Sequence, residues 1–185
     1  MKSKKNNNLT LIERKLLKFF DRPSLRIRIP RLAINQSKRP LIKNWPNFCE
    51  PWTIEQILEQ GYNWGIRTGR KIGNYYLIII DLDNIWAQEI IKTASYIRTN
   101  KGIHCYILIK ELPKSGHLFN KYGSKIGDLL SLGKQVVGIG SLHQSGISYH
   151  LKQRRHNSAW FIKLESLEEL TKFCQEREIF LKKTN

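Results

Sequence analysis

The sequence predicts an α+β fold, with a mixed or mostly antiparallel sheet in its core and helices beside it. Helical spacing of apolar residues is found near both ends of the chain, whereas the middle holds short apolar segments separated by glycines. The chain has 185 residues, 41% of them hydrophobic, which suits one domain with a substantial core. Since no repeat or long linker divides it, we expect a single domain over residues 9–180. A disordered basic segment is expected at residues 1–8 and a frayed tail at residues 181–185.

Helices and strands alternate along the first part of the chain. Leu9, Ile12 and Leu16 lie at helical spacing, and Pro23 ends that helix. The pattern Thr53-Ile54-Glu55-Gln56 is typical of a capping box that opens a short helix. We also expect a strand with a basic exposed face at residues 25–29. A second strand is expected at residues 62–66, followed by a turn at Thr68-Gly69.

The strongest predicted strand runs from Tyr75 to Asp83. Its centre is continuously apolar and β-prone, as expected for a strand buried on both faces. Ser166 opens the last helix, whose capping-box pattern includes Glu169. Between them the sequence predicts a short helix near residues 86–92 and strands at residues 96–98, 104–109, 125–129, 135–139 and 147–151.

The charge of the chain favours a polyanionic partner. There are 32 Lys and Arg against 15 Asp and Glu, a formal net charge of +17, and each phosphate that a protein neutralises releases counterions. Nucleic acid is the leading candidate, although a lysine-rich composition of AT-rich coding sequence is the alternative. Three scattered cysteines lack zinc-ligand spacing, so we expect no zinc and a reduced compartment. No apolar run is long enough to span a bilayer, so no membrane partner is expected.

Two aspartates at the end of the strongest strand are candidate metal ligands. Asp81 and Asp83 are two residues apart, so a strand directs both side chains to one face. Adjacent carboxylates repel unless a cation neutralises them, and hard oxygen ligands suit Mg²⁺ or Mn²⁺. Asp128, on a predicted strand between glycine-rich turns, is the natural third acid. The alternatives are a polar strand end for the first two residues and a turn-capping role for Asp128.

Two other segments could hold phosphates. His104 follows Lys101-Gly102 on a predicted strand; it is either a phosphate contact or a core histidine. The segment 138–146 is rich in glycine and carries Ser141 and His143. Backbone N–H groups and a hydroxyl in such a loop can cradle phosphates, although a plain hairpin turn is the alternative.

The order of these motifs resembles the N-terminal catalytic domain of bifunctional DNA primase/polymerases, the prim-pol proteins of the archaeo-eukaryotic primase superfamily. The resemblance covers Ile29 to Leu151. It is carried by Lys38-Arg39-Pro40 with Trp45, Asn63-Trp64-Gly65-Ile66-Arg67-Thr68-Gly69, Asp81-Leu82-Asp83, Thr99-Asn100-Lys101-Gly102-Ile103-His104, Gly127-Asp128-Leu129 and the stretch from Val136 to Tyr149.

The resemblance implies a primase-polymerase, RRM-like catalytic fold and a role for each matching residue. Asp81, Asp83 and Asp128 would bind two Mg²⁺ or Mn²⁺ ions and form the catalytic centre. His104 would contact the phosphates of the incoming nucleotide. Ser141 and His143 would help to hold the triphosphate, and Arg67 and Lys38 would contact nucleotide or template.

The implied activity is template-directed nucleotidyl transfer, that is, DNA primase or DNA polymerase activity in replication. The partners would be a single-stranded DNA template and NTPs or dNTPs, with a helicase as a possible separate partner. One alternative is a non-catalytic nucleic-acid-binding replication accessory protein with the same fold. A D-x-D glycosyltransferase is another, but it explains neither the positive charge nor the glycine-serine loop. The expected location is intracellular and nucleoid-associated, in a plastid or otherwise in the cytoplasm.

Overall fold

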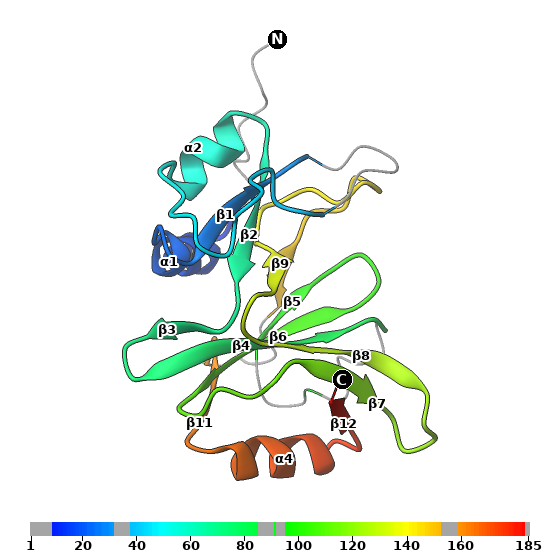
Figure 1. Ribbon diagram of the computed structural model, residues 1–185. Coiled ribbons are helices and arrows are strands. Elements are labelled where there is room, and N and C mark those ends of the chain that lie inside the picture. The colour runs from blue at the N-terminus through cyan, green and yellow to red at the C-terminus, as the bar shows by residue number, and fades with distance from the viewer. Residues whose placement is uncertain (1–8, 32–37, 85–90, 92–94, 153–158, 184–185) are drawn as a thin grey trace. The chain divides into compact units, whose positions relative to one another are not determined.

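The computed structural model describes residues 9–31, 38–84, 91, 95–152 and 159–183 (Figure 1). The chain forms two compact units, each assembled from two segments. Unit 1 comprises residues 1–67 and 135–150, and unit 2 comprises residues 68–134 and 151–185. The predicted N-terminal segment 1–8 and most of the predicted helix near residues 86–92 lie outside the described residues.

Unit 1 holds two capped helices and a three-stranded antiparallel sheet. Thr10 and Glu13 form a complete capping box at the start of one helix, and Thr53 and Gln56 form another. In both, the threonine hydroxyl and the side chain at the third helical position bond the backbone N–H groups that the first turn leaves unpaired. The sheet order is β1-β2-β9. The elements are α1 (Leu11–Phe20), β1 (Arg26–Ile29), α2 (Ile54–Glu59), β2 (Asn63–Arg67) and β9 (Gln135–Val137).

Unit 2 is built on a larger, mostly antiparallel sheet with one helix, α4 (Leu167–Gln175). The strand order is β10-β5-β6-β4-β8-β7-β12, with β3 paired to β4 and β11 paired in parallel to β6. The strands are β3 (Arg70–Ile72), β4 (Tyr75–Leu82), β5 (Tyr96–Arg98), β6 (Ile103–Ile109), β7 (Gly116–Phe119), β8 (Lys125–Leu130), β10 (His150–Lys152), β11 (Ile162–Leu164) and β12 (Phe180–Lys183). The two sheets confirm the predicted α+β class with mostly antiparallel pairing.

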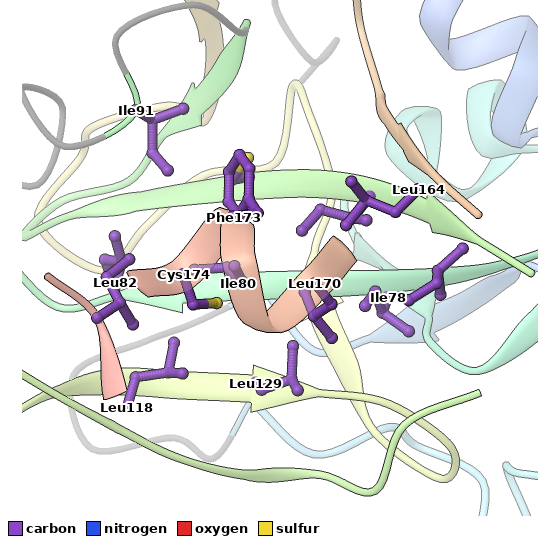
Figure 2. Packing of buried hydrophobic residues seen from close by; sticks show 14 of the residues in the cluster. Ile78, Ile80, Leu82, Ile91, Leu118, Leu129, Leu164, Leu170, Phe173 and Cys174 are labelled. Carbon is purple, nitrogen blue, oxygen red and sulfur yellow. The ribbon is translucent and has the colours of Figure 1, made fainter. Parts of the chain in front are cut away.

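The core of unit 2 lies between one face of this sheet and α4 (Figure 2). Ile78, Ile80 and Leu82 alternate along β4 and are fully buried in this cluster. Leu170 and Phe173 of α4 pack into the same cluster. Because strand side chains alternate between faces, the intervening residues of β4 lie on the opposite face. That opposite face carries the predicted acids.

Several predicted elements differ in detail from the structure. The expected basic exposed face of residues 25–29 is wrong, because Arg26 is buried and bonded to protein acceptors. At Ser166 the hydroxyl accepts from the N–H of Glu169, but the Glu169 carboxylate accepts from Glu165 instead of completing the box. The tail was expected to fray, yet β12 pairs with β7 as far as residue 183. Strands β3, β7, β11 and β12, of three or four residues each, were not predicted.

Candidate functional site

Three of the predicted site residues meet on one row across the sheet of unit 2. Asp81 of β4 stands directly opposite His104 of β6 on one side and Asp128 of β8 on the other. Directly opposite residues in an antiparallel pair share a face, with Cβ atoms about 4.5–5.5 Å apart. The sheet therefore gathers side chains from three distant parts of the sequence around the central strand.

His104 is almost completely buried beside the carboxylate of Asp81. Its Nε2 lies 3.5 Å from Oδ1 of Asp81, and only 5% of the residue is exposed. Burial, and to a smaller degree the charge of Asp81, raises the pKa of the nearby Tyr106 far above its ordinary value. The carboxylate of Asp81 is itself about 30% exposed. The carboxylate therefore lies against the buried His104 and is also reached by solvent.

Asp128 is bonded to two cationic or potentially cationic side chains. Nδ1 of His117 lies 2.5 Å from its Oδ1, and Nζ of Lys125 lies 2.9 Å from the same oxygen. Partial burial by itself raises the pKa of Asp128, but the hydrogen bonds from His117 and Lys125 and the charge of Lys125 outweigh it. The net effect is a pKa below the ordinary aspartate value, so the carboxylate stays ionised at neutral pH.

Two glycines allow the neighbouring strands to approach the end of β4. A Cβ at Gly127 of β8 would lie 2.0 Å from the carbonyl oxygen of Asp81, and a Cβ at Gly102 would lie 1.7 Å from that of Leu82. Both distances are far below van der Waals contact, so no other residue fits without movement of the backbone. Gly102 also closes a tight turn, since its N–H donates to Oγ1 of Thr99 and its carbonyl accepts from the N–H of Thr99.

Asp83, the remaining predicted metal ligand, lies one residue beyond β4 and is exposed. Its N–H donates to the carbonyl of Ile126 at 2.9 Å, which continues the β4–β8 ladder and keeps Asp83 in step with Asp81. Within the described residues, no three His, Cys, Asp or Glu side chains are arranged so that they could hold a metal ion. Mg²⁺, however, is often bound by one or two carboxylates together with substrate phosphates. The facing carboxylates of Asp81 and Asp128 fit that mode of binding.

Ser141 and Arg67 lie in unit 1 and bond to its main chain. The Ser141 hydroxyl is fully buried, accepts from the N–H of Trp64 at 3.2 Å and donates to the Trp64 carbonyl at 3.3 Å. The Arg67 guanidinium is 2% exposed and donates to the carbonyls of Pro23 and Arg26. Both side chains therefore hold segments of unit 1 together. A phosphate contact from this loop would have to come from groups other than the Ser141 hydroxyl.

His143 and Lys38 are more accessible residues of unit 1. The N–H of Ser145 donates to Nδ1 of His143 at 3.1 Å, which makes Nδ1 an acceptor and orients the ring within its turn. Lys38 is exposed, and its carbonyl accepts from the side-chain amide of Gln135 at 2.8 Å. The ring of His143 and the amine of Lys38 are the predicted contacts of unit 1 that solvent reaches.

His117 and Lys125 are site residues that the sequence did not predict. His117 follows Gly116 in a short strand, and its alternation with Phe119 is a weak signal over so few residues. Lys125 falls on a predicted strand, three residues before Asp128. Side chains three residues apart on a regular strand lie on opposite faces, so the contact between the amine of Lys125 and Asp128 is not expected from the sequence. A bulge between Leu118 and Phe119 changes the register here.

No protein-family model matches the chain, and no curated protein matches its sequence. Among the described residues, no helix has the length and apolar character needed to cross a membrane.

Proposed function

We propose that the row His104–Asp81–Asp128 in unit 2 is the centre of a metal-dependent nucleotidyltransferase of the prim-pol type, which extends or starts a strand on a nucleic-acid template. The observation that carries the proposal is the register, which sets Asp81 directly opposite both His104 and Asp128. These residues come from three motifs of the resemblance, and they lie on one face of the mostly antiparallel sheet of unit 2. The formal net charge of +17 supports a nucleic-acid substrate.

The chain's own residues would bind and orient the reacting groups. Asp81 and Asp128 would hold divalent cations through their carboxylates, and Asp83 would supply a further oxygen at the open end of β4. When bound, two such cations lower the pKa of the attacking 3′-hydroxyl and stabilise the leaving pyrophosphate. His104, fixed against Asp81, would contact the triphosphate from the β6 side. Catalysis would come mainly from positioning and charge stabilisation.

The test is synthesis of labelled products on single-stranded DNA with NTPs or dNTPs and Mg²⁺ or Mn²⁺. Asp81→Asn removes one charge at nearly constant volume, so we expect at least about a 100-fold loss of rate, with DNA binding in EDTA unchanged. Glu165→Gln is the matched control, because it removes an exposed carboxylate that pairs with Lys110 in the same unit. Wild-type protein that binds DNA normally but makes no metal-dependent product would refute the proposal.

A second candidate is a non-catalytic nucleic-acid-binding protein with the same fold. It is favoured by the contacts of Asp128, whose Oδ1 is already paired with His117 and Lys125 as in a structural ion-pair network. This candidate predicts salt-sensitive DNA binding, no synthesis with either metal, and no effect of Asp81→Asn on any measured property of the folded protein.

A further inference from the structure

We propose that the β7–β12 edge of unit 2 binds single-stranded nucleic acid, through aromatic side chains that stack on bases and lysines that contact phosphates. We call this surface the aromatic edge. It consists of Phe119, Lys121, Tyr122, Lys125, Phe180 and Lys182. The proposal rests on the proposed function and deepens it, because it names where the nucleic-acid strand would bind beside the row His104–Asp81–Asp128, which we call the acidic row.

Exposed aromatic residues are concentrated at this edge. Among the described residues, Tyr122 and Phe180 are the two aromatic side chains with large exposed hydrophobic surface, at 81% and 44% exposure. Phe180 stands directly opposite Phe119 in the β7–β12 register, so both phenylalanines belong to the same part of the edge. Stacking on such rings binds unpaired bases without regard to sequence, because every base has a π-face.

The turn between β7 and β8 holds Tyr122 in a defined position. The side chain of Asn120 accepts hydrogen bonds from the N–H groups of Tyr122 and Ser124, at 3.0 and 2.9 Å. Gly123 adopts φ +79°, which an L-residue rarely takes, and its N–H closes the turn on the carbonyl of Asn120. The phenol is therefore presented to solvent by an ordered hairpin and not by an irregular loop.

Lysines surround these rings. Nζ of Lys182 lies 4.6 Å from the centroid of Phe119, and Nζ of Lys121 lies 5.4 Å from that of Tyr122. Lys121 also pairs with Glu178 at 3.0 Å. Lys125 stands opposite Phe119 in the β7–β8 register and reaches Asp128 at 2.9 Å. The aromatic edge is thus continuous with the acidic row through the Lys125–Asp128 contact.

The distribution of charged residues in unit 2 indicates which kind of partner binds the aromatic edge. Residues 165–178, which include α4, hold five glutamates against one lysine and one arginine, so a polyanion is disfavoured on the α4 face. A second copy of the chain could pair with the edge strand β12, which also exposes Leu181. Lysine on an edge strand opposes such pairing, and Lys182 lies within β12 with an exposed side chain. Interleaved lysines and aromatics instead match a single-stranded nucleic acid.

The test is the anisotropy of a fluorescein-labelled oligothymidylate bound to the full chain in EDTA, where no synthesis occurs. We expect Tyr122→Ala to weaken binding about 10-fold, and Tyr122→Phe to bind like the wild type because the ring is kept. Lys182→Ala should lower the slope of log affinity against log salt by about one. Lys172→Ala, which removes an exposed charge on α4, is the matched control and should leave the slope unchanged.

Three outcomes would overturn the proposal. One is wild-type affinity for both Tyr122→Ala and Phe180→Ala when thermal unfolding shows each variant folded. Another is an equal loss with Leu132→Ala, an exposed apolar side chain away from this edge. The third is a change of oligomeric state in Phe180→Ala with DNA affinity intact, which would identify an interface between copies. If the Tyr122 and Phe180 variants bind DNA normally and the wild type synthesises product, only the aromatic edge is refuted. If these variants lose DNA binding and the wild type makes no product, only the proposed enzyme activity is refuted.

Discussion

The predicted site residues make different kinds of contact in the two units. In unit 1, Arg67 and Ser141 direct their hydrogen bonds to main-chain groups of neighbouring segments. In unit 2, Asp81, His104 and Asp128 instead contact other side chains across the sheet. When a side chain that donates to a buried carbonyl moves away, the carbonyl loses that hydrogen bond, which costs free energy. A side chain that contacts another side chain can instead exchange that contact for one with a ligand. The motif residues of unit 1 are thus expected to act in folding and those of unit 2 in binding.

The largest effect expected from this comparison is the loss of stability in Arg67→Ala. The substitution removes the guanidinium hydrogen bonds to the carbonyls of Pro23 and Arg26 together with a buried side chain, which should lower the free energy of unfolding by about 2–4 kcal/mol. Urea denaturation measures it. Arg98→Ala, at an exposed position of β5, is the control and should change stability little. An Arg67→Ala protein of normal stability but with a raised KM for nucleotide would instead place this residue in the nucleotide site.

A smaller effect is expected at His117, which orients the carboxylate of Asp128. His117→Ala should raise the Mg²⁺ concentration needed for half-maximal synthesis about 10-fold, since outer-shell partners of metal ligands have effects of that size. His117→Asn keeps a donor near Nδ1 and should recover most of the loss. DNA binding in EDTA should not change in either variant.

His150, the residue of β10 that belongs to unit 1, provides a control for the His117 experiment. Its Nδ1 lies 3.4 Å from a carboxylate oxygen of Glu13, and its side chain is 43% exposed against 45% for His117. His150→Ala should leave the Mg²⁺ dependence unchanged. An equal shift in both variants would show that loss of a histidine–carboxylate pair acts through general stability.

The smallest effect concerns the pH dependence of stability contributed by Asp128. Because its folded-state pKa lies below the unfolded value, ionised Asp128 stabilises the fold above the unfolded pKa, and this contribution disappears as the pH falls through the folded pKa. The group is partly exposed, so Asp128→Asn should cost less than about 1 kcal/mol at pH 7. Denaturation in EDTA at pH 7 and at successively lower pH measures the difference between wild type and variant, which should shrink as the pH falls through the folded-state pKa of Asp128. A difference that persists in acid would mean that the charge of Asp128 contributes nothing.

Local patterns in the sequence were sufficient to predict the elements that depend on neighbouring residues. The two complete capping boxes place their helices correctly, because the bonds at a helix N-terminus join residues three apart. The apolar run of β4 was predicted to be buried on both faces, and Leu77 to Ile80 are fully buried. Cys105, within the apolar run of β6, is fully buried, and burial raises the pKa of its thiol to about 12. Strands β3, β7, β11 and β12 escaped prediction, although β5, which is equally short, was predicted with its correct bounds.

The sequence by itself determined the α+β class, the order of the motifs and the candidate acids, since all of these follow from composition and local spacing. Only the tertiary structure decided which candidates meet. The β4–β6 and β4–β8 registers join Asp81 to His104 and Asp128, and no local spacing encodes a pairing between residues so far apart in the chain. The same pairing brings His117 to Asp128 and Phe180 to Phe119, because cross-strand contacts depend on the register of the whole sheet.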